Sequence, residues 1–394
     1  MDKKLNFASI PSSAYVHIPF CRRRCFYCDF PIFVVGDRSR GETSSTISHY
    51  VELLIQEISI TQSFGQPLKT IFFGGGTPSL LAIDQLQQIL ASLERHFGIV
   101  PGAEISMEMD PGTFDLAHIE GYRSLGVNRV SLGVQAFQAE LLKVAGRSHS
   151  IADIFAAVEL LRKVEIPEFS LDLISGLPHQ SLEDWQDSLF QAVAIAPTHI
   201  SIYDLTIEPG TAFGRYYKPG DRPLPTDETT VQMYQMAQQV LTGAGYEHYE
   251  ISNYAQPGHQ CQHNRVYWEN RPYYGFGMGA ASYVDSKRFT RPRKTKEYYQ
   301  WVEAGCIVDC EVTPVNEVLL ETLMLGLRLA EGLSLETLGA EFGEKKVEDI
   351  HQFLQPYFDK GWVEVIEGRL RLSDPQGFLF SNVVLAELFA EFGE

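Results

Sequence analysis

The sequence predicts an α/β protein made of about six βα units, followed by a smaller α+β domain at the C-terminus. Two patterns support this prediction. Six short apolar runs, each typical of a buried strand, alternate with segments whose apolar residues recur at helical spacing. Glycine and proline clusters follow several of these runs. Repeated βα units with right-handed crossovers form a parallel sheet, so the sequence fits either a partial (β/α) barrel or an open doubly wound sheet.

The predicted strands follow one another at the spacing of βα units. They cover residues 14–18, 69–73, 105–109, 129–134, 169–174 and 199–205. Helical spacing is clearest after the first strand, at Val51, Leu54 and Ile58, and after the second, at Leu86 and Leu90. In both candidate folds the active site lies at the carboxyl ends of the strands, so we expect the functional residues there.

A change of composition after the last strand predicts the domain boundaries. Residues 208–229 are rich in proline and glycine and precede a helical segment at 231–241, so we expect the barrel domain to span residues 1–245. Residues 246–314 are dense in aromatic residues, Gly, Asn and His, and form a predicted connecting region. Residues 315–394 contain three helical segments and two short strands around Glu367-Gly368, an order that resembles a winged-helix domain.

Charge and composition exclude some classes of partner. The formal net charge is -18, and residues 315–394 carry 15 Asp or Glu against 6 Lys or Arg. An acidic surface repels nucleic acid, so we expect the C-terminal domain to pack against or dock protein instead. The N-terminal residues lack the apolar core of a signal peptide, and the chain has no run of about 18 apolar residues. With six cysteines that fit a reducing compartment, this predicts a cytoplasmic protein and leaves peripheral membrane contact open.

Three of the six cysteines lie within eight positions, in the stretch Y-V-H-I-P-F-C-R-R-R-C-F-Y-C-D-F at the end of the first strand. Cys21, Cys25 and Cys28 have the spacing C-x-x-x-C-x-x-C. Three thiolates can hold three irons of a [4Fe-4S] cluster and leave the fourth iron open to another ligand. The alternatives are an incomplete zinc site and three buried thiols without metal. The arginines between the cysteines predict either a solvated face or a docking face for an acidic electron donor.

This loop resembles the cluster loop of the radical S-adenosylmethionine (SAM) superfamily, and that resemblance favours the partial (β/α)6 barrel. The sequence Y-x-H-I-P-F-C narrows the resemblance to the branch that contains oxygen-independent coproporphyrinogen dehydrogenase and the HemW-type haem chaperones. The resemblance implies that SAM binds the open iron through its amino and carboxylate groups. It also implies that an electron from the cluster cleaves SAM to a 5′-deoxyadenosyl radical.

Further motifs match the SAM-contacting positions of this superfamily. The turn G-G-G-T-P follows the second strand, and its Gly75, Gly76 and Thr77 match the turn that meets the SAM amino group. The remaining matches are Tyr15, Glu108 in S-M-E-M-D-P, Gln135 in S-L-G-V-Q-A-F, Arg147, and Asp172 in L-D-L-I-S-G-L-P. Acidic and amide side chains at strand ends can bond ribose hydroxyls and an ammonium, and an arginine can hold a carboxylate.

Other features separate the members of this branch. Dehydrogenases carry a further cysteine two residues after the third cluster cysteine, where this chain has Phe30, and a longer segment before the cluster. The stretch 263–268, H-N-R-V-Y-W, matches the H-N-x-x-Y-W motif of HemW-type chaperones. A neutral imidazole is a natural axial ligand of haem iron, so His263 is the candidate haem ligand, with His259 and Cys261 as alternatives. A histidine beside a tryptophan is also often a hydrogen-bonded core residue.

The combined prediction is a haem chaperone that carries a [4Fe-4S] cluster and exchangeable SAM, binds haem, and passes it to acceptor apoproteins of respiration. The cluster implies an electron donor as a further partner. One alternative is oxygen-independent coproporphyrinogen III dehydrogenase, which oxidatively decarboxylates propionates to vinyl groups. Another is a related radical SAM methyltransferase. No residue is assigned a catalytic role, and whether the protein is an enzyme is left open.

Overall fold

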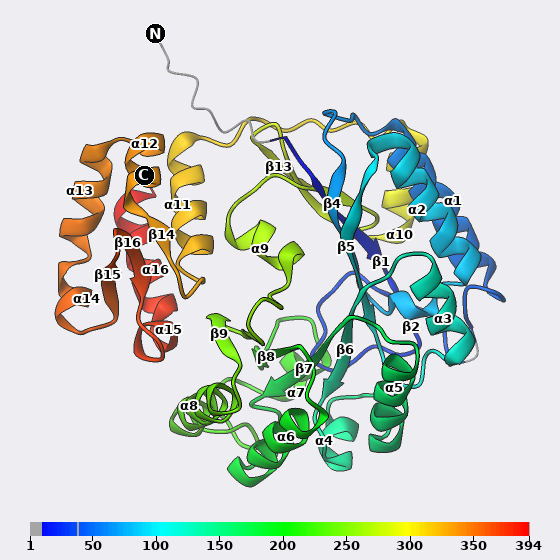
Figure 1. Cartoon of the computed structure of the whole chain (residues 1–394), viewed down its shortest axis with the longest axis horizontal. Coiled ribbons are helices and arrows are strands. Elements are labelled where there is room, and N and C mark those ends of the chain that lie inside the picture. The colour runs from blue at the N-terminus through cyan, green and yellow to red at the C-terminus, as the bar shows by residue number, and fades with distance from the viewer. Residues whose placement is uncertain (1–9, 38, 394) are drawn as a thin grey trace.

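Nine strands form one curved sheet that wraps around a central space, with helices on its outer side (Figure 1). The computed structural model describes residues 10–37 and 39–393, and the strand order is β11-β1-β4-β5-β6-β7-β8-β10-β9. The six central strands are parallel and follow the order of the sequence: β1 (Ser13–Ile18), β4 (Leu68–Gly75), β5 (Ile99–Met109), β6 (Arg129–Gln135), β7 (Glu168–Ser175) and β8 (His199–Asp204). This sequential order confirms the predicted partial (β/α)6 barrel, because a doubly wound sheet reverses direction at a switch point.

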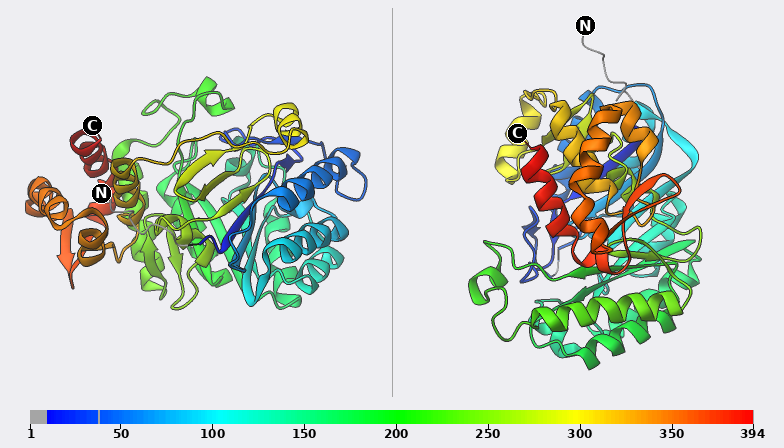
Figure 2. Two further views of the ribbon diagram at one scale, coloured as in Figure 1. Left: turned by 90° about the horizontal axis from the view of Figure 1, so that it is seen from above. Right: turned by 90° about the vertical axis from the view of Figure 1, so that its left-hand side faces the viewer.

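Polar caps explain where most of the outer helices begin. The helices that cover the outside of the sheet in Figures 1 and 2 are α1 (Ser45–Ile60), α2 (Ile83–Phe97), α3 (Leu116–Ser124), α5 (Ile151–Lys163), α6 (Leu182–Ile195) and α8 (Asp227–Gly243). Ser44, Asp115, Ser150, Ser181 and Thr226 each accept a hydrogen bond from the backbone N–H three residues later. Such caps satisfy N–H groups that have no partner within the helix.

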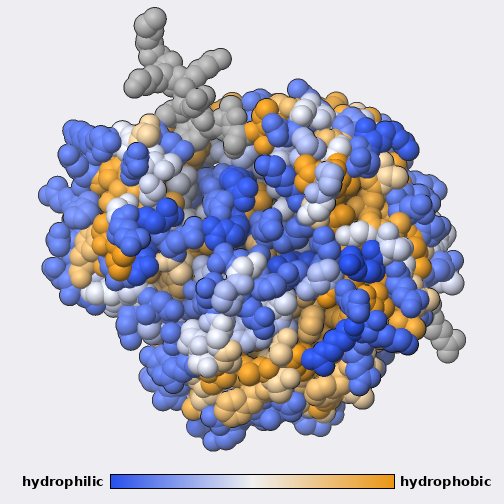
Figure 3. Space-filling view, in the orientation of Figure 1, coloured by the Kyte–Doolittle hydropathy of each residue, from blue (hydrophilic) through white to orange (hydrophobic). Residues whose placement is uncertain are grey.

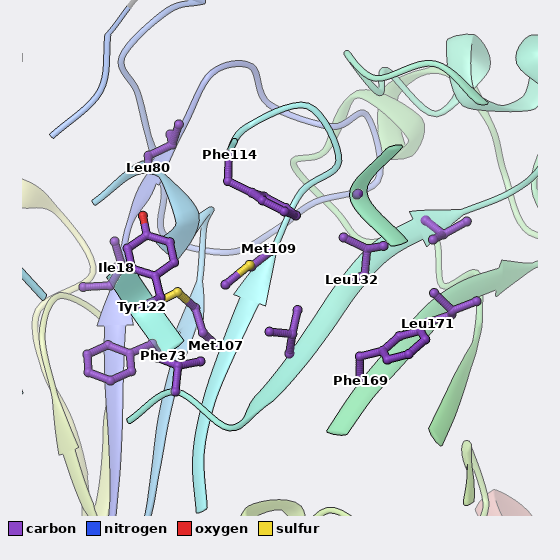
Figure 4. Close-up of a cluster of buried hydrophobic side chains, with 14 of the residues drawn as sticks. Ile18, Phe73, Leu80, Met107, Met109, Phe114, Tyr122, Leu132, Phe169 and Leu171 are labelled. Carbon is purple, nitrogen blue, oxygen red and sulfur yellow. The ribbon is translucent and has the colours of Figure 1, made fainter. Parts of the chain in front are cut away.

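Alternation along the strands separates an apolar outer layer from a polar interior. Met107 of β5, Leu132 of β6 and Leu171 of β7 belong to the hydrophobic cluster in Figure 4. Neighbouring residues of a strand point to opposite faces of the sheet, so Glu108 and Asp172 point inward and line its cavities. The same local pattern that builds the core therefore presents carboxylates to the interior.

The predicted connecting region contributes strands to both edges of the sheet. β10 (Asn253–Ala255) pairs antiparallel with β8, and β9 (Glu247–Glu250) pairs antiparallel with β10 at the edge of the sheet. At the other edge, β11 (Tyr274–Phe276) is parallel to β1. The region also contains the helices α9 (Gln262–Trp268) and α10 (Thr295–Glu303) and the hairpin of β12 (Ala281–Val284) and β13 (Lys287–Thr290). The domain limits 1–245 and 246–314 stay a prediction, but the sheet continues across residue 245.

The C-terminal domain has a three-stranded sheet of order β14-β16-β15 and a hydrophobic core, which Tyr234 of α8 joins from the barrel. Its elements are α11 (Val315–Gly326), β14 (Leu333–Ser334), α12 (Leu335–Phe342), α13 (Glu344–Phe353), α14 (Gln355–Asp359), β15 (Val363–Ile366), β16 (Arg369–Leu372), α15 (Gln376–Leu379) and α16 (Ser381–Phe392). Glu367 and Gly368 both have positive φ, as the two-residue turn of a hairpin requires. This arrangement agrees with the predicted winged-helix-like domain.

The outer surface carries both polar and apolar residues. On the face shown in Figure 3, hydrophobic residues gather over the lower part, where α6 and α8 lie. Among the described helices, none is both long and apolar enough to cross a membrane. The predicted absence of a signal peptide concerns residues 1–9, which lie outside the described residues.

A buried carboxylate fastens the connecting region to the barrel. Glu57 of α1 is fully buried and accepts hydrogen bonds from Arg291 Nε (2.6 Å), Tyr298 Oη (2.6 Å) and the Gly277 backbone N–H (2.8 Å). Removing one partner of such a pair leaves the other charge buried and unpaired. Glu57 therefore binds three groups of residues 277–298 to α1, and Tyr50 of the same helix adds a fourth contact by accepting from the Met278 N–H at 3.0 Å.

We expect Glu57→Ala to lower the free energy of unfolding by about 3–5 kcal/mol, because Arg291 loses its counter-ion in the interior. Urea unfolding followed by circular dichroism measures this change. Glu52→Ala is the matched control, since Glu52 lies on the same helix with a side chain that is 74% exposed, and we expect its effect to stay within about 0.5 kcal/mol. Equal stabilities of the two variants would contradict the prediction.

Candidate functional site

Backbone hydrogen bonds hold the two ends of the loop that carries the three cysteines. After β2 (Phe20–Cys21), the chain returns as β3 (Phe33–Val34), and the Val35 N–H donates to the Cys21 carbonyl at 2.9 Å. The Arg24 guanidinium lies against this loop and donates to the carbonyls of Cys28 (3.1 Å), Phe30 (3.2 Å) and Ile32 (3.3 Å). The loop is thus held by backbone pairing at its ends and by one arginine across its middle.

The other two arginines of the loop also have partners within the protein. Arg22 donates to the Gly112 carbonyl at 2.9 Å, and Arg23 pairs with Asp37 at 2.7 Å. These contacts give the arginine run a structural role in addition to the predicted solvated or docking face. Docking of an electron donor here stays a prediction.

A cavity of about 420 Å³ opens beside this loop at the carboxyl ends of the strands. Its lining contains ten of the eleven residues predicted for the cluster and SAM: Cys21, Cys25, Cys28, Gly75, Gly76, Thr77, Glu108, Gln135, Arg147 and Asp172. Tyr15, the eleventh, lines a smaller cavity of about 210 Å³ deeper in the barrel. Glu108 and Asp172 line both cavities, so the two spaces adjoin.

The glycine turn after β4 packs closely against β1 and the cluster loop. A Cβ atom on Gly75 would lie 2.3 Å from the His17 ring, and one on Gly76 would lie 2.8 Å from the Ile18 carbonyl oxygen. The N–H groups of Gly75, Gly76 and Thr77 all donate within the protein. The turn therefore offers carbonyl oxygens to a ligand, and these match an N–H donor such as the SAM amino group.

Two of the three thiols lie close to polar side chains of predicted SAM residues. Arg147 Nη1 lies 3.3 Å from Cys25 Sγ, and Thr77 Oγ1 lies 3.7 Å from Cys21 Sγ. Burial raises the pKa of the Cys21 and Cys28 thiols, so ionising them calls for positive charge such as iron. Within the described residues, no three His, Cys, Asp or Glu side chains form a site for a single metal ion. A cluster fits the loop better than zinc does, because each of its thiolates binds a different iron.

The carboxyl groups of Glu108 and Asp172 line the cavity, and they accept hydrogen bonds from different kinds of donor. Burial raises the pKa of Glu108 to about 8, and its Oε2 accepts from the Gly75 N–H at 2.9 Å. Burial also raises the pKa of Asp172, which accepts hydrogen bonds from Ser131 Oγ at 2.7 Å and Ser170 Oγ at 3.2 Å. Without a ligand, Glu108 therefore holds a proton at neutral pH.

The structure adds cavity residues that sequence reasoning missed. Asp110 pairs with Arg147 and accepts a hydrogen bond from Thr77, and Tyr203 lies at the mouth with 48% of its surface exposed. Asp110 stands two positions after Glu108, so alternation along β5 was a signal that both face the cavity. Tyr203 lies in β8, two positions after Ser201, which lines the inner cavity, so alternation along that strand was a signal for it as well.

The predicted haem ligand His263 is fully buried on α9 and lines neither cavity. Its Nδ1 lies 2.8 Å from Thr70 Oγ1, and its Nε2 lies 2.9 Å from Tyr267 Oη. Burial lowers its pKa to about 3, so the ring is neutral. In this conformation neither ring nitrogen is free to bind iron. Its neighbours Asn264 and Tyr267 line the inner cavity.

The two alternative ligands also have partners. His259 Nδ1 pairs with Glu168 Oε1 at 2.8 Å. Cys261 is buried, lines the inner cavity, and its Sγ lies 3.7 Å from Glu104 Oε1. The haem ligand therefore stays a prediction for all three residues.

Comparison with known proteins agrees with this geometry. A family model described as "Radical SAM superfamily" matches residues 15–192, and one described as "HemN C-terminal domain" matches residues 314–380. The chain is 48% identical to the haem chaperone HemW of Synechocystis sp., with 98% of each chain covered. It is 33% identical to HemW of Bacillus subtilis, with 96% of this chain and 99% of that one covered. The chain belongs to the HemW family of radical SAM proteins.

A solved structure shares the fold over almost the whole chain. Coproporphyrinogen III oxidase (HemN) of Escherichia coli is 24% identical, with a TM-score of 0.80 over 95% of this chain and 89% of that one. This similarity concerns the fold alone, because the identity is low. It extends across the barrel and the C-terminal domain.

Membership in the HemW family confirms the prediction of a [4Fe-4S] cluster and SAM as cofactors. The cavity fits both groups. The three cysteines stay our predicted cluster ligands, and Arg147 Nε, buried without a partner among the described residues, is free to hold the SAM carboxylate. When bound, the cluster and SAM would supply one-electron chemistry, and the side chains of the cavity would hold SAM in place and exclude water.

We expect SAM binding to release protons from Glu108. Its pKa of about 8 falls when the cationic ligand arrives, so the affinity for SAM rises with pH up to about 8 and then levels. Anaerobic calorimetry of cluster-loaded protein at pH 7, in buffers of different ionisation enthalpy, measures the release. We expect Glu108→Gln to release fewer protons than the wild type when SAM binds. Protons that come from the SAM amino group are released in both proteins, so the difference between them measures the release from Glu108. The same release from both proteins would refute the assignment.

Proposed function

We propose that this protein is a haem chaperone that binds haem, carries a [4Fe-4S] cluster with exchangeable SAM, and transfers haem to acceptor apoproteins. The observation that carries this proposal is the 48% identity to a haem chaperone over 98% of both chains. Coproporphyrinogen oxidase is related at the level of the fold. Phe30, exposed by 51% at the mouth of the cavities, stands where the dehydrogenases carry another cysteine.

The acceptors are proposed to be apoproteins of the respiratory chain, and an electron donor is proposed to reduce the cluster. The acidic C-terminal domain supports contact with protein instead of nucleic acid. Its contacts with the rest of the chain include ion pairs of Arg265 with Glu331 (2.7 Å) and of Arg288 with Glu321 (2.9 Å), beside an apolar cluster that joins Leu329 to Tyr249 and Ala255. We propose a cytoplasmic location on the basis of the free cysteines of the described chain.

One comparison separates the chaperone from the oxidase. Anaerobic, cluster-loaded protein is titrated with haem and followed by its Soret band, and a second sample receives coproporphyrinogen III, SAM and a reductant. We expect a saturable haem spectrum, loss of that haem to an added respiratory apoprotein, and no vinyl product. Vinyl product without a haem spectrum would reverse the proposal in favour of the dehydrogenase.

Binding of haem iron by His263 requires α9 to open locally, because both ring nitrogens are bonded to Thr70 and Tyr267. When the competent state is a small fraction, the apparent affinity falls by that fraction. Changes that free the ring therefore strengthen haem binding if His263 is the ligand. The same changes have no such effect if the iron binds elsewhere.

We expect Thr70→Val and Tyr267→Phe each to raise the affinity for haem several-fold, because each removes a hydrogen bond that competes with iron. His263→Ala should weaken haem binding and leave the cluster absorbance unchanged. Tyr254→Phe is the matched control, since its buried hydroxyl has no hydrogen-bond partner among the described residues. Haem titrations followed by the Soret band measure all four variants. Unchanged affinity in the first three would place the ligand elsewhere, with His259 or Cys261 next in line.

A further inference from the structure

Asp110 stands immediately after β5, in the wall of the cluster cavity, and contacts two residues that themselves reach cluster cysteines. One of its carboxylate oxygens pairs with Arg147 Nη2, and the other accepts from Thr77 Oγ1 at 3.2 Å. Arg147 Nη1, on the same guanidinium, lies 3.3 Å from Cys25 Sγ. The contacts form a chain from Asp110 through Arg147 to Cys25.

The backbone around Asp110 fixes where its carboxylate points. Its N–H donates to Ser79 Oγ at 3.4 Å, and its carbonyl accepts from Thr113 Oγ1 at 2.6 Å. Ser79 and Thr113 are both buried. Asp110 is therefore held through its main chain, which leaves its side chain to orient others.

Arg147 depends on this carboxylate for its position. Its side chain is only 7% exposed, and its other contacts on Nη2 are the Gly133 carbonyl at 2.9 Å and, at the longer distance of 3.5 Å, His149 Nδ1. A Cβ atom on Gly133 of β6 would lie 2.9 Å from Asp110 Oδ1 and 3.2 Å from Arg147 Nη2. The absence of a side chain at Gly133 therefore leaves room for the Asp110–Arg147 ion pair against β6. Burial lowers the pKa of Arg147, but Asp110 and Cys25 raise it well above its ordinary value, so the guanidinium stays charged.

Thr77 has one hydroxyl hydrogen for two acceptors. Asp110 Oδ2 at 3.2 Å is nearer than Cys21 Sγ at 3.7 Å, and a carboxylate is the stronger acceptor. The hydroxyl therefore donates to Asp110, and the route from Asp110 to the cluster runs through Arg147 and not through Thr77.

We propose that Asp110 is a positioning residue for the iron-sulfur cluster: it aims the Arg147 guanidinium at Cys25 Sγ, so that the cluster thiolate receives a charged hydrogen bond. Hydrogen bonds to cluster sulfurs raise the reduction potential, because they stabilise the added electron. The proposal concerns residues of this chain and does not rest on the haem chaperone function, so either can fail without the other.

Two variants of Asp110 separate the effect of positioning Arg147 from the effect of removing a negative charge near the cluster. Asp110→Asn and Asp110→Ala both remove one negative charge, but only asparagine keeps an oxygen that can accept from Arg147. The through-space effect of losing a negative charge is to raise the potential, and it is the same in both variants. Loss of the hydrogen bond to Cys25 lowers the potential, and it occurs fully only in the alanine variant.

The experiment is a reductive titration of cluster-loaded full-length protein, followed by electron paramagnetic resonance, with iron and sulfide measured for each sample. We expect Asp110→Ala to have a lower potential than Asp110→Asn. If alanine loses the cluster while asparagine retains it in folded protein, the proposal is also supported. Equal potentials in the two Asp110 variants, or equal loss of the cluster from both, would overturn it.

Discussion

The site depends on the close approach of two backbone segments, the glycine turn after β4 and the end of β1. The Gly76 N–H donates to the Ile18 carbonyl at 2.9 Å, and the Thr77 N–H donates to the Phe20 carbonyl at 2.7 Å. A side chain on Gly75 or Gly76 would occupy space taken by His17 or Ile18. Because the first cluster cysteine follows Phe20 directly, these bonds set the distance between the cysteine loop and the strands that carry the SAM residues.

The carboxyl ends of β4 to β7 and the turn before α5 each contribute residues to the lining of the cluster cavity. Alternation along a strand places an inward residue beside each core residue, as with Glu108 next to Met107. The inward carboxylates lie in a buried space, which is why Glu108 carries a raised pKa. A cation in that cavity is favoured for the same reason, since it compensates a carboxylate that water no longer solvates.

The H-N-x-x-Y-W motif matches the family but does not determine whether the His263 ring is accessible to haem iron. The match of residues 263–268 to H-N-x-x-Y-W agrees with the family, but in the structure His263 is bonded on both ring nitrogens and stacked on Phe72. Tyr267 is four residues later on the same helix, so its bond to His263 follows from helical spacing. Thr70 is far away in the sequence, and its contact with His263 exists only because α9 packs on β4.

The sequence by itself determined the order of the six βα units and identified ten of the residues that line the cluster cavity. Local periodicity is a property of neighbouring residues, so the predicted strands needed no knowledge of packing. The three cysteines followed from their spacing, and the SAM residues followed from the resemblance of their motifs to those of the radical SAM superfamily. Only the tertiary structure decided that β9, β10 and β11 complete the sheet edges, that Asp110 joins the cluster site, and that His263 is enclosed. These features depend on contacts between residues distant in the chain, which edge pairing and burial select after the local elements have formed.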